Sequence, residues 1–184
     1  MKTQLSDKEL YEAFLSGDNT SLEVIISRYR MRLIRFIQSY VKSFEIAEDL
    51  AQDVFVYLLI KRKKYDFKYS MKTYLFTIGK SRAINYLKRE SAVSFENVYA
   101  DEPSYENMPE DSILTKEQNM ILYKAIQQLN EKQCAAVYLS DIEGLSNKEV
   151  SIALGKSLSE TKMILYRARK NLRTILEQEG FRYE

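Results

Sequence analysis

From residue 145 to residue 155 the chain reads LSNKEVSIALG. Ser146 stands three residues before Glu149, and this spacing is the capping box that begins a helix, because each side chain can bond the other residue's backbone N–H group. Gly155 favours the left-handed backbone that ends a helix. A short helix followed by a glycine-containing turn is the first half of a helix-turn-helix motif.

A long last helix follows, and its two faces differ. Ser157 or Ser159 can cap this helix, and its pattern continues to about Gln178. The inner face carries the apolar residues Leu165, Ala168, Leu172 and Ile175. The opposite row consists of Lys162, Tyr166, Arg169 and Arg173, with Arg167 and Lys170 beside it. Such a basic row suits contact with the major groove and phosphates of DNA, although an ordinary amphipathic surface helix would share the pattern.

The composition excludes several classes of protein. The 184 residues include no His and one Cys, so a His-based catalytic triad is excluded, and a zinc or haem site nearly so. Five Gly and two Pro are too few for a sandwich or barrel. The sequence therefore predicts an all-α protein that is not an enzyme and has no metal or cofactor. The polar start, and the lack of ~20 consecutive apolar residues, predict a cytoplasmic protein without a membrane span.

The net charge of +2 hides an uneven distribution of charge. Residues 1–90 hold 17 basic and 11 acidic side chains, whereas residues 91–112 hold six acids and no base. Residues 113–184 hold 11 basic and 9 acidic side chains. The acidic stretch contains both prolines and no helical apolar stripe, so it reads as a flexible linker. We expect two helical domains, 1–90 and 113–184, joined by the acidic linker 91–112.

The domain 1–90 opens with three predicted helices, at 8–16, from about 20 to 40, and at 45–60. Thr20 or Ser21 can cap the second helix. The third helix has an apolar stripe, and its first turns are acidic, which suits the positive end of the helix dipole. Its exposed side would carry Glu48, Asp49, Gln52 and Asp53. Taken alone, these side chains indicate a solvated helix face.

Basic and aromatic residues are interleaved over residues 61–90, which carry ten Lys and Arg and only two acids. Lys and Arg neutralise phosphates, and aromatic rings stack on unpaired bases at roughly 1–3 kcal/mol per base. The mixture therefore suits single-stranded or opened DNA better than an intact duplex. Several of the aromatic residues have helical spacing and belong to the core, and we expect Tyr65, Phe67 and Tyr69 to be the more exposed ones.

The domain 113–184 begins with two further predicted helices, at 116–129 and from 131 to about 142. Cys134 lies in an apolar part of the second, where a packing role is favoured over redox sensing.

Several motifs, in their order along the chain, resemble the extracytoplasmic-function sigma factors of the bacterial sigma-70 family. Residues 47–55, AEDLAQDVF, resemble the family's polymerase-binding helix. Residues 73–87, TYLFTIGKSRAINYL, resemble its −10 reading region. Residues 141–150 resemble the start of its region 4 helix-turn-helix, and residues 166–170, YRARK, the end of the recognition helix. The sequence departs from the family at Tyr74 (usually Trp), Ser81 (usually Asn) and Glu160-Thr161-Lys162, so the preferred promoter sequence can differ.

The resemblance implies a region 2 bundle and a region 4 helix-turn-helix in a non-catalytic initiation factor. Its partners would be core RNA polymerase, through the clamp helices and flap, promoter DNA, and an anti-sigma factor. The polymerase would be bound by Glu48, Asp49, Gln52 and Asp53. The melted −10 strand would be bound by Lys64, Tyr65, Phe67, Lys68, Tyr69, Lys72, Tyr74, Lys80, Ser81, Arg82 and Asn85. The −35 duplex would be read by Ser159, Glu160, Lys162, Met163, Tyr166, Arg167, Arg169 and Lys170. The acidic linker would occupy a basic nucleic-acid channel of the polymerase.

Two alternatives remain at this point. A stand-alone helix-turn-helix regulator would explain residues 146–175 but would leave the third helix and residues 61–90 without a role. A metal-dependent nuclease could use Glu48, Asp49 and Asp53, but no further acidic pair is placed to complete a two-metal site.

Overall fold

The computed structural model describes residues 4–93 and 116–180. These residues form two compact units, which divide within the acidic stretch. The acidic linker predicted from the sequence lies outside the described residues, except for its first three. Every regular element in the described parts of both units is helical, as the sequence predicts.

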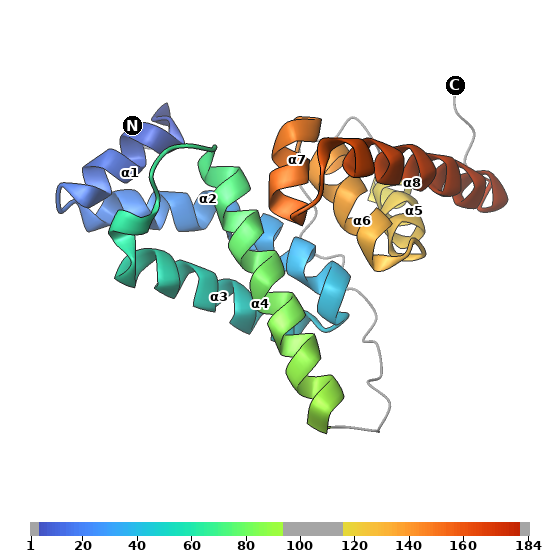
Figure 1. The fold of residues 1–184 in the computed structure, drawn as a ribbon, viewed down its shortest axis with the longest axis horizontal. Helices are drawn as coiled ribbons and strands as arrows, with labels where there is room; N and C mark the ends of the chain where they lie inside the picture. Colours follow the sequence, from blue (N-terminus) through green and yellow to red (C-terminus); the bar gives the residue numbers. More distant parts are fainter. Residues whose placement is uncertain (1–3, 94–115, 181–184) are drawn as a thin grey trace. The chain divides into compact units, whose positions relative to one another are not determined.

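In the first unit, the described residues 4–93 form a bundle of four helices, whose arrangement Figure 1 shows. They are α1 (Asp7–Leu15), α2 (Asn19–Val41), α3 (Phe44–Ile60) and α4 (Met71–Val93), and the short 3₁₀ turn η2 (Arg62–Lys64) follows α3. Asp18 caps α2, so neither Thr20 nor Ser21 is the cap; both of these hydroxyls donate to the Asp18 carboxylate, Thr20 at 2.6 Å and Ser21 at 2.8 Å.

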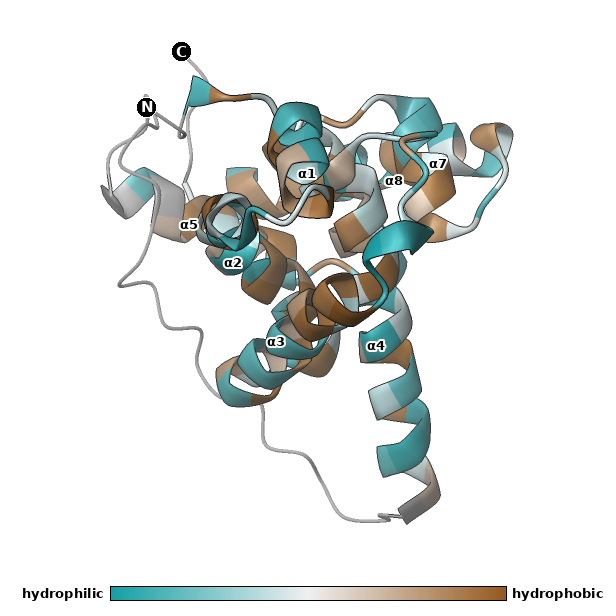
Figure 2. Cartoon of the chain, turned by 90° about the vertical axis from the view of Figure 1, so that its left-hand side faces the viewer, coloured by the Kyte–Doolittle hydropathy of each residue, from teal (hydrophilic) through white to brown (hydrophobic). Residues whose placement is uncertain are grey.

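The core of this unit lies where α2, α3 and α4 meet, and Figure 2 shows hydrophobic residues there. Leu33 and Ile37 of α2, Val54 of α3 and Leu75 and Phe76 of α4 are fully buried. The rings of Phe36 and Phe76 meet edge to face, with centroids 5.0 Å apart. The last turns of α4 project away from the bundle and are largely hydrophilic (Figure 2).

The second unit contains α5 (Lys116–Gln127), α6 (Glu131–Val137), α7 (Asn147–Leu154) and α8 (Leu158–Gln178). Its core joins Ile126 and Leu129 to Cys134, Val137 and Ala168, with Leu172 and Ile175 packed against them. Cys134 is buried in this core, which agrees with the packing role expected of it. The helix predicted to run from 131 to about Ile142 consists of two parts. The α-helix α6 ends at Val137, and the π-helical turn η3 (Tyr138–Ile142) continues it.

Candidate nucleic-acid and protein-binding surfaces

Both helices of the predicted helix-turn-helix begin at capping boxes. Ser146 caps α7 with Glu149, and Ser157 caps α8 with Glu160. Gly155 ends α7 with a φ of 63°, a conformation that costs glycine little. The motif predicted from the sequence is therefore present, and the first of the two candidate caps for α8, Ser157, is the one used.

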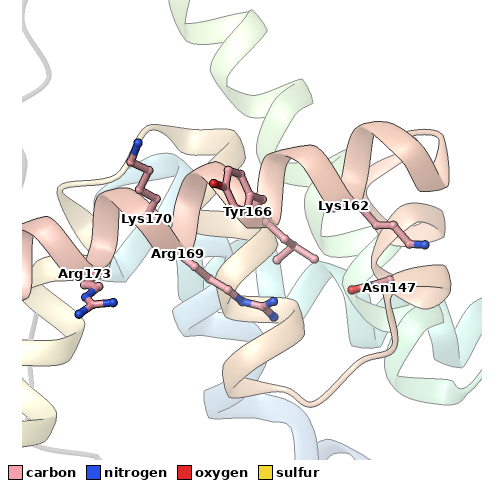
Figure 3. Close-up of a pocket in the computed structure, with 7 residues that line it drawn as sticks. Asn147, Lys162, Tyr166, Arg169, Lys170 and Arg173 are labelled. Atoms are coloured by element: carbon pink, nitrogen blue, oxygen red, sulfur yellow. The ribbon is translucent and has the colours of Figure 1, made fainter. Parts of the chain in front are cut away.

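The exposed side of α8 borders an open groove of about 610 Å³. The side chains that line it are Asn147, Lys162, Leu165, Tyr166, Arg169, Lys170 and Arg173 (Figure 3). Four of the seven are cationic, and Tyr166 is 70% exposed beside them. The groove thus offers positive charge and an aromatic face together, which suits phosphates and base edges.

The predicted −35 residues all lie on exposed positions of α8. Two of them already have a structural role. The Glu160 carboxylate accepts a hydrogen bond from the Ser157 backbone N–H at 2.9 Å. Arg169 donates from Nε to Asp141 at 3.0 Å and from a terminal nitrogen to the Ser140 hydroxyl at 3.1 Å. These two side chains are held in place by hydrogen bonds within the second unit.

Besides the buried Leu165, two polar residues that line the same groove were not predicted from the sequence as −35 residues. Asn147 comes from the first turn of α7, and Arg173 continues the row of α8 by one turn. The spacing of the basic row places Arg173 on the same face of α8, so the sequence could have identified it. The position of Asn147 beside the groove follows only from the packing of α7 against α8.

The exposed side of α3 is acidic in its first half and apolar in its second. Asp49, Gln52 and Asp53 are exposed, as predicted, and Glu48 is half-buried and paired with Arg30 of α2. The same side then carries Val56, Leu59 and Ile60, which are 50%, 43% and 66% exposed. The exposure of these apolar residues was not predicted, because a hydrophobic run at the end of a helix resembles core.

We call residues 61–70 the connecting segment, because they join α3 to α4. Tyr65 in this segment is buried, at 7% exposure, so the prediction that it is among the more exposed aromatic residues is wrong. Its ring packs on Tyr11, Phe67 and Tyr74, and burial raises its pKa to about 12. Phe67 is half-buried, whereas Lys64, Lys68 and Tyr69 are exposed.

The predicted −10 residues of α4 do not share one face. The spacing of Tyr74, Ser81 and Asn85 places them on one side of α4, while Lys72 and Lys80 lie on another. The Arg82 guanidinium lies over the ring of Tyr57 of α3, 5.9 Å from its centroid. The structure thus joins Tyr74, Ser81 and Asn85 into one surface and separates Lys72 and Lys80 from it.

The described residues contain neither a cluster of metal ligands nor a helix that could span a membrane. Over residues 4–93 and 116–180, no three side chains of His, Cys, Asp or Glu lie where they could share a metal ion. Within these same ranges, no helix has the length and apolar character needed to cross a membrane.

Comparison with known families assigns both units. Residues 25–93 match Sigma-70 region 2, and residues 119–172 match Sigma-70, region 4. The ECF RNA polymerase sigma-E factor of Escherichia coli is 24% identical over 180 residues, covering 92% of this chain and 94% of the relative. The sigma-E factor of Haemophilus influenzae is 25% identical, with 92% and 95% covered.

Two solved structures share the fold. CnrH, solved in complex with the cytosolic domain of CnrY, aligns with a TM-score of 0.66 at 20% identity, over 94% of this chain and 97% of that one. The sigma factor RpoE of Bartonella quintana, solved with the anti-sigma factor NepR, aligns with a TM-score of 0.63 at 23% identity, over 83% and 96%.

The two units and their matches define the class: the chain belongs to the sigma-70 family. It is an RNA polymerase sigma factor of the extracytoplasmic-function (ECF) group. The stand-alone regulator would account for the second unit alone, whereas the region 2 match covers the first unit as well.

Proposed function

We propose that this sigma factor docks on the polymerase clamp through α3, holds the melted −10 strand with the connecting segment and α4, and reads the −35 duplex with α8. In this role it is an initiation factor without catalytic activity that acts with the polymerase in the cytoplasm. The observation that carries the proposal is the presence of three distinct exposed surfaces on the two matched units.

The α3 surface suits a protein partner. Asp49, Gln52 and Asp53 supply charge and hydrogen-bonding groups, and Val56 and Ile60 extend the same side with exposed apolar area. A charged rim next to an apolar patch is typical of a protein interface. Glu48 has a smaller part in docking, because its carboxylate is already paired with Arg30.

The −10 surface combines cations with rings. Lys64 and Lys68 are exposed in the connecting segment. The Lys68 ammonium lies over the ring of Tyr69, 5.5 Å from the ring centroid. Tyr74, Ser81 and Asn85 continue along one side of α4. Tyr65 supports this surface from the core, and the buried ring is not available to stack on a base.

The −35 surface is the groove along α8. In the groove, Lys162 and Lys170 supply positive charge, Tyr166 is 70% exposed, and Arg169 presents a fixed guanidinium. Met163 of the same helix does not line the groove but is 52% exposed. A recognition helix with such a row enters the major groove and neutralises phosphates on its borders.

Run-off transcription tests the whole proposal. Core polymerase from a close relative is supplied with a pool of genomic fragments, with and without this protein. We expect discrete new transcripts that are lost when Asp49→Ala is combined with Asp53→Ala. The matched control combines Glu12→Ala with Glu23→Ala, which removes two exposed acids of the same unit away from α3. Sequence-specific duplex binding without any transcript would favour the stand-alone regulator.

An anti-sigma partner is the second part of the proposal. The aligned RpoE structure contains an anti-sigma factor, and the fold is shared over 83% of this chain. The apolar residues Val56, Leu59 and Ile60 offer a surface for which such a partner and the polymerase would compete. Val56→Lys combined with Ile60→Lys should then weaken binding to the anti-sigma factor and to the polymerase. If the double variant binds both partners normally, the shared surface is refuted.

A further inference from the structure

The first helix lies outside the part of the chain that matches region 2, yet it is firmly attached to that part. The Asp7 carboxylate accepts hydrogen bonds from Arg28 and from the Tyr29 hydroxyl, both on α2. Arg28 also donates to the backbone carbonyl of Leu5 at 3.0 Å. These contacts fix the start of α1 on α2, and Figure 1 shows the two helices side by side.

Besides α2, the helix α1 contacts the connecting segment. Tyr11 is fully buried, and its hydroxyl donates to the backbone carbonyl of Arg62 at 2.8 Å. Its ring meets Tyr65 edge to face at 5.1 Å, and Phe67 likewise at 6.0 Å. One side chain of α1 thus contacts the connecting segment at its start and at its middle.

The connecting segment needs such support because it has little regular structure of its own. It contains only the three-residue turn η2, and Phe67 has a φ of 58°. This left-handed conformation costs a non-glycine residue about 1–3 kcal/mol and persists only where packing imposes it. Tyr65, which packs on Tyr11, fixes the far end of the segment by donating its hydroxyl to the Tyr69 carbonyl at 2.7 Å.

We propose that Tyr11 is a positioning residue for −10 recognition: its hydroxyl and ring hold the connecting segment in the conformation that presents Lys64, Lys68 and Tyr69 to the unpaired strand. This inference rests on the proposed function of that segment. Tyr11 itself touches no DNA, since its side chain is fully buried.

The test is Tyr11→Phe, which keeps the ring and removes only the hydroxyl that bonds to Arg62. The first readout is the rate of trypsin cleavage after Arg62, Lys63, Lys64 and Lys68 in the full chain, with the cut sites identified by mass spectrometry. The second readout is the affinity of the holoenzyme for a single-stranded oligonucleotide. Its sequence is the non-template −10 strand of a promoter identified by run-off transcription. We expect roughly two- to tenfold faster cleavage and two- to tenfold weaker binding, the range for one lost hydrogen bond.

The matched control is Tyr138→Phe, the same chemical change at a buried tyrosine of the second unit. It should alter neither readout. A positive control, Tyr69→Ala, removes an exposed ring of the segment and should weaken oligonucleotide binding without any change in α1. Binding of core polymerase should be the same in all three variants.

The outcomes separate the inference from the proposed function. If Tyr11→Phe leaves either readout unchanged while Tyr69→Ala weakens binding, Tyr11 has no positioning role. If Tyr69→Ala and Lys68→Ala also bind normally, the connecting segment does not hold the −10 strand, and the proposed function of that segment is overturned. The cleavage rate then still reports whether Tyr11 holds the segment.

Discussion

At the scale of single residues, the cations of α8 differ in how far they are already engaged. Arg169 is bonded to Asp141 and Ser140, whereas Lys162 borders the groove on an exposed position. We predict that Lys162→Ala makes the negative slope of log affinity against log salt shallower by about 0.9, as expected for one lost phosphate contact, at unchanged thermal stability. Arg169→Ala should in addition reduce the free energy of unfolding, by less than about 1 kcal/mol because the pair is partly exposed. The measurements are −35 duplex binding at several salt concentrations and thermal unfolding.

Equal stability of the two variants would contradict the view that the Asp141 pair helps to hold α8. Equal salt slopes of Lys162→Ala and the unchanged protein would remove Lys162 from the phosphate-binding row.

The cap of α8 is a second feature at this scale, and it predicts a pH dependence. Hydrogen bonds from the Ser157 backbone and side chain lower the pKa of Glu160 below its ordinary value of 4.5. A lowered pKa in the folded state means that the ionised carboxylate stabilises the helix start fully above pH 4.5 and loses this effect as the pH falls through the folded-state pKa. The amide signals of the first turn of α8 should therefore shift toward disorder below about pH 4.5 in an NMR titration.

Glu160→Gln is the control, because Gln can cap a helix in the same way but does not titrate. The first turn in this variant should be insensitive to pH over the same window. An acid transition at the same pH in Glu160→Gln would assign the effect to another group.

At the scale of the elements, the approach of α4 to α2 depends on one glycine. A Cβ added at Gly79 would lie 2.8 Å from Leu33 Cδ1 and 3.4 Å from Ile37 Cδ1. Alanine favours a helix over glycine by about 1 kcal/mol, but crowding in a packed core costs about 1–3 kcal/mol. We predict that Gly79→Ala lowers the free energy of unfolding by up to about 2 kcal/mol, measured by urea denaturation.

Ser81→Ala is the control, because it introduces the higher helix propensity of alanine without crowding Leu33. Ser81 is exposed and lies two residues further along α4. This control should be as stable as the unchanged protein or slightly more so. A stabilising Gly79→Ala would show that Leu33 can move aside at little cost.

Local signals in the sequence were sufficient for most of these elements. Ser146 with Glu149 and the apolar row of α8 predict two helices and their faces, because caps and helical spacing act within a few residues. The exposure of Tyr65 could not be predicted in the same way. It depends on Tyr11, which is far away in the sequence, and nothing near Tyr65 announces that contact.

The surface of α3 shows the same limit for the candidate site. The exposure of Asp49 and Asp53 was predicted, because charged side chains are rarely buried. The exposure of Val56 and Ile60 was missed, because only the positions of α2 and α4 reveal which side of α3 is left uncovered. Residues whose environment is set by distant elements are therefore the ones that sequence reasoning misplaces.

At the scale of the whole molecule, the proposed reading of two promoter elements by two units depends on the chain between them. A tether sets the effective concentration of the second unit at its site, and this concentration falls roughly as the −3/2 power of tether length. Charge is a separate property of this tether. Residues 91–112 carry six acids and no base, although the whole chain has a net charge of +2. Length and charge can therefore be tested independently of each other.

We predict that replacing these six acids by Asn and Gln at constant length weakens promoter-dependent initiation, because an acidic strand is attracted to a basic nucleic-acid channel and its neutral counterpart is not. The affected residues are Glu96, Asp101, Glu102, Glu106, Glu110 and Asp111. The measurement is the yield of run-off transcripts from one promoter at two salt concentrations, since screening should reduce the difference between the proteins. A variant in which residues 91–112 are shuffled keeps both length and charge and should initiate normally. If the neutral variant matches the unchanged protein, the linker acts only as a tether, and a shuffled variant that fails would point to a specific sequence within it.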